Sequence, residues 1–443
     1  MDAAKLNSRD WTALIDDIVA GDFYDAEAGK KASVPYEAIV FRESLDGMED
    51  ALIADLKLGE KLAIVADENT YDALGQRVAQ AVKAVSANDV FVLKSPHADM
   101  RTAAELADTL KGYDSVIAIG SGTINDLCKY VTAQDSRRYA VFATAASMNG
   151  YTSTTASMTL ESGLKVSLPA QAPAGFFVDM NTSATAPPHL AASGFADCIA
   201  RSVAQVDWWM SHRLLDTLYR TVPFEIQIAD EVALNKCAHL LPKGDIDATA
   251  RLHRVLTLCG LGISFIGMSH PGSMGEHQIS HYIDCFAGPL HPGTLHGQQV
   301  GVASLTMARI QQGLLSREYA PVMKPTSIDF DGMKQRMGAT ANQCLEQLQR
   351  KALEGAALDL VNEKLADIWP DLKREVQEFM LPVAEMEQLL SDAGAPTTAA
   401  DLGIDLAFYQ QAVRYGHEMR DRFSFVDIAA NADLLETFVS AQT

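Results

Sequence analysis

Short apolar segments alternate with helical segments through the first part of the chain, and this alternation stops at a pair of prolines. The apolar segments lie at 61–67, 90–94, 115–120 and 138–145. Apolar residues at helical spacing separate them, at 71–85, 101–112 and 123–132. Strands that alternate with helices are typical of a parallel sheet covered by helices on both faces. The sequence therefore predicts an α/β domain built on a parallel sheet.

The pattern changes beyond residue 151. Residues that favour strands lie on both sides of Gly163 and predict a hairpin, and 174–180 predicts one more strand. After Pro187-Pro188 the strand signals stop, and the spacing is helical as far as residue 442. We therefore predict three parts: an N-terminal extension (1–35, with a turn or two of helix in Trp11–Ala20), an α/β domain (36–186) and an all-helical domain (187–443).

The formal net charge of −21 excludes several classes of partner. Such a charge repels nucleic-acid backbones and anionic membranes, so neither is expected, and an anionic substrate would need a local cluster of donors. The six cysteines include no Cys-x-x-Cys pair, which predicts reduced thiols in a cytoplasmic protein. The acidic, polar N-terminus predicts no signal peptide, and no apolar stretch is long enough to predict a membrane span.

A glycine-containing turn directly follows the third predicted strand. Gly120, Ser121, Gly122, Thr123 and Ile124 lead from that strand into the next helix. Glycines let the backbone approach a phosphate closely, and a helix N-terminus offers N–H groups with a partial positive charge. The turn is therefore a candidate pyrophosphate site. An ordinary strand-to-helix turn is the alternative, because Asn125 replaces the third glycine of the Gly-x-Gly-x-x-Gly pattern.

Asp67 ends the first predicted strand. An acid at this position of a dinucleotide-binding fold bonds the adenosine ribose hydroxyls and repels a 2′-phosphate. Asp67 therefore favours NAD(H) over NADP(H) as the cofactor. A solvated acid at the end of a strand is the alternative.

Histidines gather between residues 270 and 296, which hold five of the eleven in the chain. His277 and His281 are four residues apart and share one face of a predicted helix, while His296 precedes another helix and Asp197 opens an alanine-rich one. Two imidazoles and one carboxylate leave positions open on a divalent ion, as a catalytic site requires. Scattered surface or core histidines are the alternative. The chain lacks His-Glu-x-x-His and Gly-x-Ser-x-Gly, which argues against a zinc peptidase and a serine hydrolase.

Several segments together resemble the glycerol-1-phosphate dehydrogenase branch of the iron-containing alcohol dehydrogenase and dehydroquinate synthase superfamily. They are Gly120–Asp126, Ala143–Ser153, Gly194–Asp197, Ser269–His277 with His281, Leu295–Gly297 and Gly394–Thr398. The likeness runs over roughly residues 38–430. It implies a dehydroquinate synthase-like architecture: an α/β NAD(P)-binding domain, an all-helical domain, and an active site in the cleft between them.

The resemblance also implies roles for the matching residues. The turn Gly120–Ile124 would hold the pyrophosphate, and the nicotinamide end would be flanked by Thr144, Ala145, Ala146, Ser147 and Ser153. One divalent ion would be bound by Asp197, His277 and His296. Zn²⁺, Fe²⁺ and Ni²⁺ all accept this ligand set.

Three residues, Asn149, Asp197 and His281, would face the substrate. His281 is the candidate for relaying a proton or orienting the substrate, because an imidazole ordinarily titrates near neutral pH. The branch usually has Asp where this chain has Asn149, Arg where it has His270, and Lys where it has Arg201. Arg201 and His270 are candidate donors to a substrate phosphate. These departures bear on the identity of the substrate rather than on the class of chemistry.

The resemblance thus implies a metal-dependent, NAD(P)-linked dehydrogenase, a homodimer that interconverts dihydroxyacetone phosphate and sn-glycerol 1-phosphate. Three alternatives stay open. One is a dehydrogenase of the same architecture that acts on another polyol, aldehyde or phosphonate. Another is a cyclase like dehydroquinate synthase, although such enzymes use more Lys and Arg around the substrate. The last is a metal-binding or regulatory protein without catalysis, against which the intact ligands and glycine turn argue.

Overall fold

The computed structural model describes residues 11–442, and the chain divides into two compact units. The first unit comprises Met1–Gly194 and Thr221–Gly267, and the second comprises Phe195–Arg220 and Met268–Thr443. The units differ from the predicted domains 36–186 and 187–443 mainly because 221–267 belongs to the first unit. A compact unit is not a domain shown to fold alone, so the domain boundaries stay a prediction.

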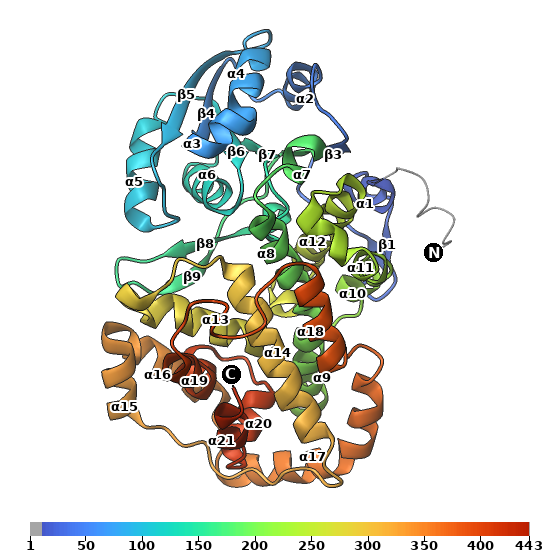
Figure 1. Ribbon diagram of the computed structural model, residues 1–443, viewed down its shortest axis with the longest axis vertical. Coiled ribbons are helices and arrows are strands. Elements are labelled where there is room, and N and C mark those ends of the chain that lie inside the picture. Colours follow the sequence, from blue (N-terminus) through green and yellow to red (C-terminus); the bar gives the residue numbers. More distant parts are fainter. Residues whose placement is uncertain (1–10, 443) are drawn as a thin grey trace. The chain divides into compact units, whose positions relative to one another are not determined.

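A six-stranded parallel sheet in the order β3-β10-β7-β6-β4-β5 forms the centre of the first unit (Figure 1). Its strands are β3 (Ala38–Arg42), β4 (Lys61–Asp67), β5 (Ala87–Leu93), β6 (Ser115–Gly120), β7 (Tyr139–Ala143) and β10 (Gly175–Asp179). The strands predicted at 61–67, 90–94, 115–120, 138–145 and 174–180 are confirmed. The edge strand β3 is an addition that the sequence pattern does not predict.

Alternate residues of each strand pack on opposite faces of the sheet, as strand geometry requires. Val65, Val116 and Val141 belong to one apolar cluster, and Ile64, Ile117 and Phe142 belong to the other. The first cluster includes side chains of α1 (Ala13–Val19), α5 (Met100–Thr109) and α6 (Gly122–Gln134). The second includes side chains of α2 (Glu49–Leu56) and α4 (Gln76–Val82). Burial on both faces explains why these strands read as continuous apolar runs.

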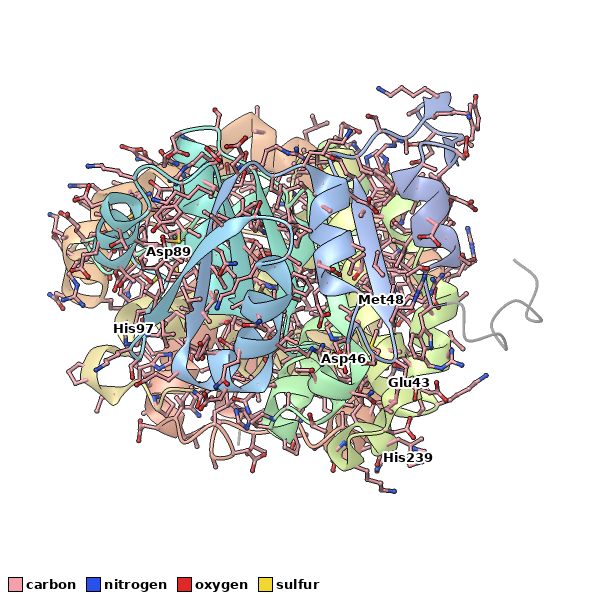
Figure 2. All side chains as sticks on the ribbon, turned by 90° about the horizontal axis from the view of Figure 1, so that it is seen from above. Glu43, Asp46, Met48, Asp89, His97 and His239 are labelled. Atoms are coloured by element: carbon pink, nitrogen blue, oxygen red, sulfur yellow. The ribbon has the colours of Figure 1, made fainter. Side chains whose placement is uncertain are left out.

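The two edges of the sheet are visible in Figure 2, where Asp89 and His97 lie on one side and Glu43, Asp46 and Met48 on the other. The predicted hairpin is confirmed: β8 (Thr155–Thr159) pairs antiparallel with β9 (Lys165–Pro169), and Gly163 adopts a φ of 84° in the connection. The other elements of this unit include β1 (Tyr24–Asp25), β2 (Lys30–Lys31), α3 (Glu68–Thr70), a π-helical turn (Tyr71–Gly75), α7 (Met180–Ala184), α10 (Val222–Glu225), α11 (Ile228–Asn235) and α12 (Ile246–Ile266).

The described residues of the second unit form helices joined by loops, and no strand is found among them. Its α-helices are α9 (Arg201–Leu215), α13 (Gly275–Phe286), α14 (His296–Leu315), α15 (Phe330–Met337), α16 (Ala341–Lys351), α17 (Gly355–Val376), α18 (Val383–Asp392), α19 (Leu406–Tyr415), α20 (Phe425–Asn431) and α21 (Leu435–Ser440). Helix α14 is buried along most of its length and packs against α9, α13, α18 and α20. Among residues 11–442, no helix has the length and apolar character needed to span a membrane.

Candidate functional site

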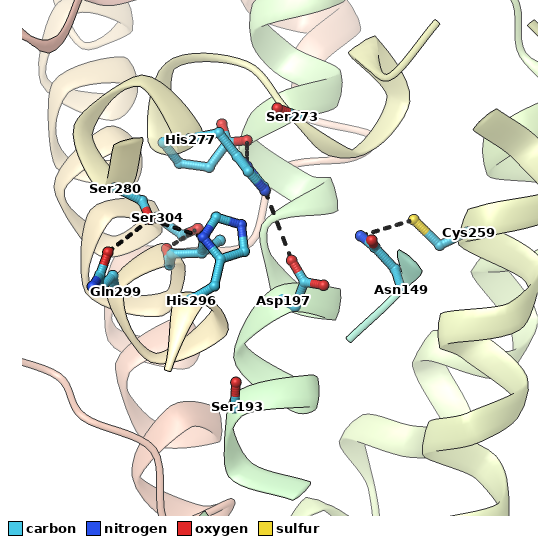
Figure 3. Close-up of polar contacts among 12 residues, drawn as sticks. Asn149, Ser193, Asp197, Cys259, Ser273, His277, Ser280, His296, Gln299 and Ser304 are labelled. Carbon is cyan, nitrogen blue, oxygen red and sulfur yellow. Dashed lines mark hydrogen bonds and ion pairs between the residues drawn. The ribbon is translucent and has the colours of Figure 1, made fainter. Parts of the chain in front are cut away.

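Three potential metal ligands converge in the second unit (Figure 3). Asp197 lies on α8 (Pro188–Ile199), His277 lies in the first turn of α13, and His296 is the first residue of α14. One ligand atom from each residue lies within 4.8 Å of the other two. Asp197 Oδ1 and His277 Nε2 are 3.8 Å apart. The structure thus brings together the three residues that the sequence analysis assigns to the metal.

The position of Asp197 on its helix differs from the prediction. The sequence analysis places Asp197 at a helix start, whereas α8 begins at Pro188 and ends at Ile199, two residues beyond Asp197. Proline suits a first helical turn because its missing N–H would have no partner there. Gly194 lies inside the helix for a packing reason, since a Cβ there would be 2.0 Å from the Ala146 carbonyl oxygen.

Glu276 fixes the ring of His277. His277 Nδ1 lies 2.7 Å from Glu276 Oε1, which also accepts the N–H of Met274 at 2.7 Å. An ionised carboxylate only accepts hydrogen bonds, so Nδ1 carries the ring proton. The lone pair of Nε2 therefore points to the side where Asp197 lies.

Ser280 fixes the ring of His296 in the same sense. The Ser280 hydroxyl donates to Gln299 Oε1 at 3.1 Å, so it accepts from His296 Nδ1, 3.2 Å away. A hydroxyl has a single proton, so Ser280 cannot donate to Gln299 and to His296 at the same time. His296 therefore keeps the lone pair of its Nε2 for another partner. Two imidazoles in this tautomer beside a carboxylate fit a divalent ion with open coordination positions.

A second buried carboxylate, that of Asp207, lies near enough to Glu276 to feel its charge. Asp207 accepts the N–H groups of Gly275 at 3.2 Å and Phe425 at 3.0 Å. Burial raises the pKa of Asp207 to about 8, and the charge of Glu276 contributes to the rise. Near neutral pH Asp207 is therefore mostly protonated, and Glu276 is the carboxylate that contacts the ring of His277.

Two arginines near the C-terminal end of the chain lie beside the histidine cluster, in the same unit. Arg420 Nη2 donates to His281 Nδ1 at 2.9 Å, and because a guanidinium only donates, the ring proton of His281 is on Nε2. The His281 ring centroid is 6.0 Å from that of His277 and 5.6 Å from that of His296. The sequence analysis does not single out Arg420 or Arg422. The signal that would find them is a pair of arginines two residues apart in an acidic chain.

The three residues that depart from the family pattern have different surroundings. Arg201 Nη1 donates to Gln205 Oε1 at 2.8 Å. Burial, together with the charges of Arg422 and Arg420, lowers the pKa of His270 to about 3, so its imidazole is neutral. Asn149 lies in the first unit, where its Nδ2 donates to Cys259 Sγ at 3.7 Å (Figure 3). A substrate role for these residues stays a prediction.

The glycine turn joins β6 to α6 in the first unit. Ser121 is the N-cap of α6 but makes no side-chain cap bond, so it leaves the first-turn N–H groups for another acceptor. A Cβ on Gly120 would lie 2.7 Å from the Cβ of Ile124, whereas one on Gly122 would meet only Met148 Sδ, at 3.4 Å. Gly120 therefore permits close packing of strand and helix, and Gly122 leaves the space before the helix open.

Asp67 and Gly120 each end a strand, and because β4 and β6 are neighbouring parallel strands, the two residues lie at the same carboxyl-terminal end of the sheet. From β4 the chain continues to β5 on one side, and from β6 it continues to β7 on the other. Dinucleotides bind at such a switch point. Asp67 also has a structural task, since its Oδ1 accepts the Thr70 N–H at 2.8 Å and caps α3.

The segment Thr144–Ser147 follows β7, and its carbonyl groups face the protein. Ala145 O accepts the Tyr151 hydroxyl at 2.9 Å, and Ser147 O accepts the Ser193 hydroxyl at 3.4 Å. The Thr144 N–H donates to Gly120 O at 3.2 Å. The segment is therefore held against the glycine turn by its own backbone.

Ser153 is buried, and its hydroxyl lies 3.2 Å from Lys129 Nζ. Lys129, which the sequence analysis does not single out, is fully buried on α6 and also donates to the carbonyl groups of Gly150 and Thr155. Burial lowers the pKa of Lys129 to about 8. Lys129 thus ties the loop that carries Ser153 to the helix that starts at the glycine turn.

Comparisons with known proteins bear on the family and the fold of the chain. Residues 40–187 match the family model of the iron-containing alcohol dehydrogenases. A glycerol-1-phosphate dehydrogenase (NAD(P)+) of Methanoculleus marisnigri is 31% identical over 65% of this chain and 78% of that protein. Its namesake from Bacillus velezensis is 26% identical over 91% of this chain and 94% of that protein.

A solved structure also matches: an archaeal halo-thermophilic alcohol dehydrogenase from a Red Sea brine pool, with a TM-score of 0.62 and 15% identity. The match covers 92% of this chain and 98% of that one. At this identity it supports the fold alone. The fold class predicted from the sequence is confirmed.

Proposed function

Because the chain belongs to the glycerol-1-phosphate dehydrogenase family of the iron-containing alcohol dehydrogenases, we propose that it reduces dihydroxyacetone phosphate to sn-glycerol 1-phosphate. It is an NAD(P)-linked oxidoreductase by this membership. The observation that carries the proposal is the convergence of Asp197, His277 and His296, with both imidazoles held in the tautomer that leaves Nε2 for a metal. Zn²⁺, Fe²⁺ and Ni²⁺ all suit this set.

We assign the cofactor to the first unit. The uncapped start of α6 at Gly122 would receive the pyrophosphate, and the segment Thr144–Ser147 with Ser153 would flank the nicotinamide. Asp67, at the neighbouring strand end, favours NAD(H) because a carboxylate repels the 2′-phosphate of NADP(H). A homodimer is proposed by family likeness.

A divalent ion held by these three residues would supply Lewis acidity toward the carbonyl oxygen of the substrate, and NADH would supply the hydride. The chain's residues hold the reacting groups. Glu276 and Ser280 keep His277 and His296 oriented, and His281 presents its Nε2–H as a donor. Of the two roles predicted for His281, the tautomer favours orienting the substrate. A neutral imidazole that gave up its Nε2 proton would become an imidazolate, which is a costly species near neutral pH.

Glutamine at position 276 is expected to weaken metal binding about 10- to 100-fold, because it removes the charge that supports the Nδ1 proton of His277. The size of the side chain is retained, so the fold should persist. Competition titration with a chromophoric chelator would measure the affinity. Glu363→Gln, an exposed position of the same unit, is the matched control. Wild-type metal affinity in the Glu276→Gln protein would show that Glu276 does not support the ligand.

The substrate is tested by NADH oxidation with a panel of carbonyl compounds. Purified, metal-loaded protein is expected to oxidise NADH with dihydroxyacetone phosphate far faster than with dihydroxyacetone or simple aldehydes. Chiral analysis of the product should give sn-glycerol 1-phosphate. Turnover only with another polyol, aldehyde or phosphonate carbonyl would favour the second candidate, which Asn149 and the neutral His270 keep open. No turnover with any carbonyl compound would contradict both.

A further inference from the structure

We propose that Arg420 and Arg422 form the site that binds the anionic group of the substrate, next to the proposed metal ligands. Both arginines belong to the segment that follows η8 (Gly416–Met419), more than a hundred residues along the chain from the histidine cluster. The identity of the anion as the phosphate of a triose phosphate rests on the proposed function. The site itself rests on the contacts and charges of the second unit.

The two guanidinium groups surround Ser273. Arg420 Nη1 donates to Ser273 Oγ at 3.4 Å, and its Nη2 donates to His281 at 2.9 Å. Arg422 donates to the carbonyl oxygen of Ser273 and to Ser269 Oγ, the latter at 2.7 Å. Arg422 therefore anchors the loop before α13. Arg420 is less committed, because its two protein contacts use two of the five N–H donors of a guanidinium.

No described carboxylate lies within ion-pair distance of either arginine. Among the described residues, the other arginines of this region have acidic partners within 4.0 Å, as Arg336 has Glu418 and Arg414 has Glu436. The ion pairs of residues 11–442 include neither Arg420 nor Arg422. Burial lowers the pKa of both groups, and the charge of Arg420 helps to lower the pKa of Arg422 to about 9. The charges of Glu276 and Asp421 act on both groups without forming an ion pair with either, and they oppose the lowering of the pKa. Two partly buried cations with no carboxylate in contact repel each other, and a bound anion would offset that repulsion.

His270 adds an independent observation at the same place. It lies close enough to both guanidinium groups for their charges to lower its pKa. Its Nδ1 is buried and has no hydrogen-bond partner in the described part of the chain. Buried polar atoms without a hydrogen-bond partner are rare in folded proteins, so each one requires a structural or functional explanation. A ligand held by the two arginines would place hydrogen-bonding groups within this neighbourhood.

The position of the pair fits a phosphate ester of a small carbonyl compound. His281 contacts Arg420 and also packs beside His277 and His296, so a single imidazole separates the guanidinium group from the proposed metal ligands. In dihydroxyacetone phosphate the phosphate ester is attached to the carbon next to the carbonyl group. Arginine binds phosphate through paired N–H donors. Because the chain carries a net charge of −21, an anionic substrate needs such local cations.

The test compares substrates with and without the phosphate. Arg420→Gln is expected to lower kcat/KM for dihydroxyacetone phosphate about 10- to 100-fold, mainly through KM, which is the loss of a charged hydrogen bond. For dihydroxyacetone the change should stay within about threefold, and Arg420→Lys should recover part of the loss. Arg414→Gln removes an arginine that has its own carboxylate partner and is the matched control.

Inorganic phosphate provides a readout that does not need the proposed substrate. At saturating NADH, which occupies the dinucleotide site, phosphate should raise the Tm of wild-type protein and of Arg414→Gln, should raise the Tm of Arg420→Lys less, and should leave the Tm of Arg420→Gln unchanged. If wild-type protein fails to reduce dihydroxyacetone phosphate but shows this Arg420-dependent protection, the proposed function is wrong and the anion site stands. If wild-type protein reduces it and Arg420→Gln lowers kcat/KM equally for both substrates with phosphate protection unchanged, the anion site is wrong.

Discussion

Protein with alanine in place of His277 is expected to fold, to contain no bound divalent metal and to lose turnover by about a thousandfold or more. His277 Nε2 lies 3.8 Å from Asp197 Oδ1, and three side chains make up the cluster. Removal of one imidazole leaves two ligands, too few for a stable site of this class. The change also leaves Glu276 Oε1 without its His277 contact, which costs about 1–3 kcal/mol of unfolding free energy rather than the whole fold.

Elemental analysis of the purified variant measures metal per chain, and NADH oxidation measures turnover. His239→Ala is the control, because His239 is an exposed histidine of the first unit (Figure 2). Circular dichroism should show the same helical content in all three proteins. A His277→Ala protein with a full complement of metal and wild-type activity would refute the ligand assignment. A protein that lost its helical signal would instead place His277 among the residues that hold the unit together.

The parts of the fold that the sequence predicts are those whose burial shows in a local pattern. β4 and β6 are buried on both faces and stand out as apolar runs. β3 escapes detection because it is an edge strand with only alternate residues buried and a charged residue at its end. The helix position of Asp197 is mispredicted for a related reason. A glycine such as Gly194 usually indicates the end of a helix. In the structure Gly194 lies inside α8, and glycine is needed there because the backbone of Ala146 packs against it, a contact that the sequence does not display.

The candidate site likewise contains residues that a local sequence pattern predicts and residues that it does not. His277 and His281 are predictable together because their spacing of four places them on one helical face. Arg420 contacts His281 from 139 residues along the chain, and no spacing rule connects the two. Lys129 is a further case, since a single lysine in a helix is ordinarily exposed, whereas here the carbonyl groups of Gly150 and Thr155 bind it inside. Residues whose role depends on packing of distant segments cannot be read from local sequence.

Alanine at position 194 is expected to lower the free energy of unfolding by about 3 kcal/mol, the upper end of the range for overpacking. A Cβ there would lie 2.0 Å from the Ala146 carbonyl oxygen and 3.2 Å from Leu256 Cδ1. In a helix interior alanine gains about 1 kcal/mol over glycine. The steric term is larger, because the obstructing atom belongs to a backbone segment whose neighbours are already held by Tyr151 and Ser193. Urea unfolding and Tm would measure the loss.

The same change should weaken NADH binding, because relief of the clash must displace the segment Thr144–Ser147 that we assign to the nicotinamide. Gly122→Ala separates the two effects. Its Cβ would meet only the flexible Met148 side chain at 3.4 Å, so stability should change by no more than about 0.5 kcal/mol. NADH affinity should nevertheless fall, since the added methyl group lies where the pyrophosphate approaches. A Gly194→Ala protein as stable as wild type would show that α8 can move away from Ala146. The packing reason given for glycine at this position would then be wrong.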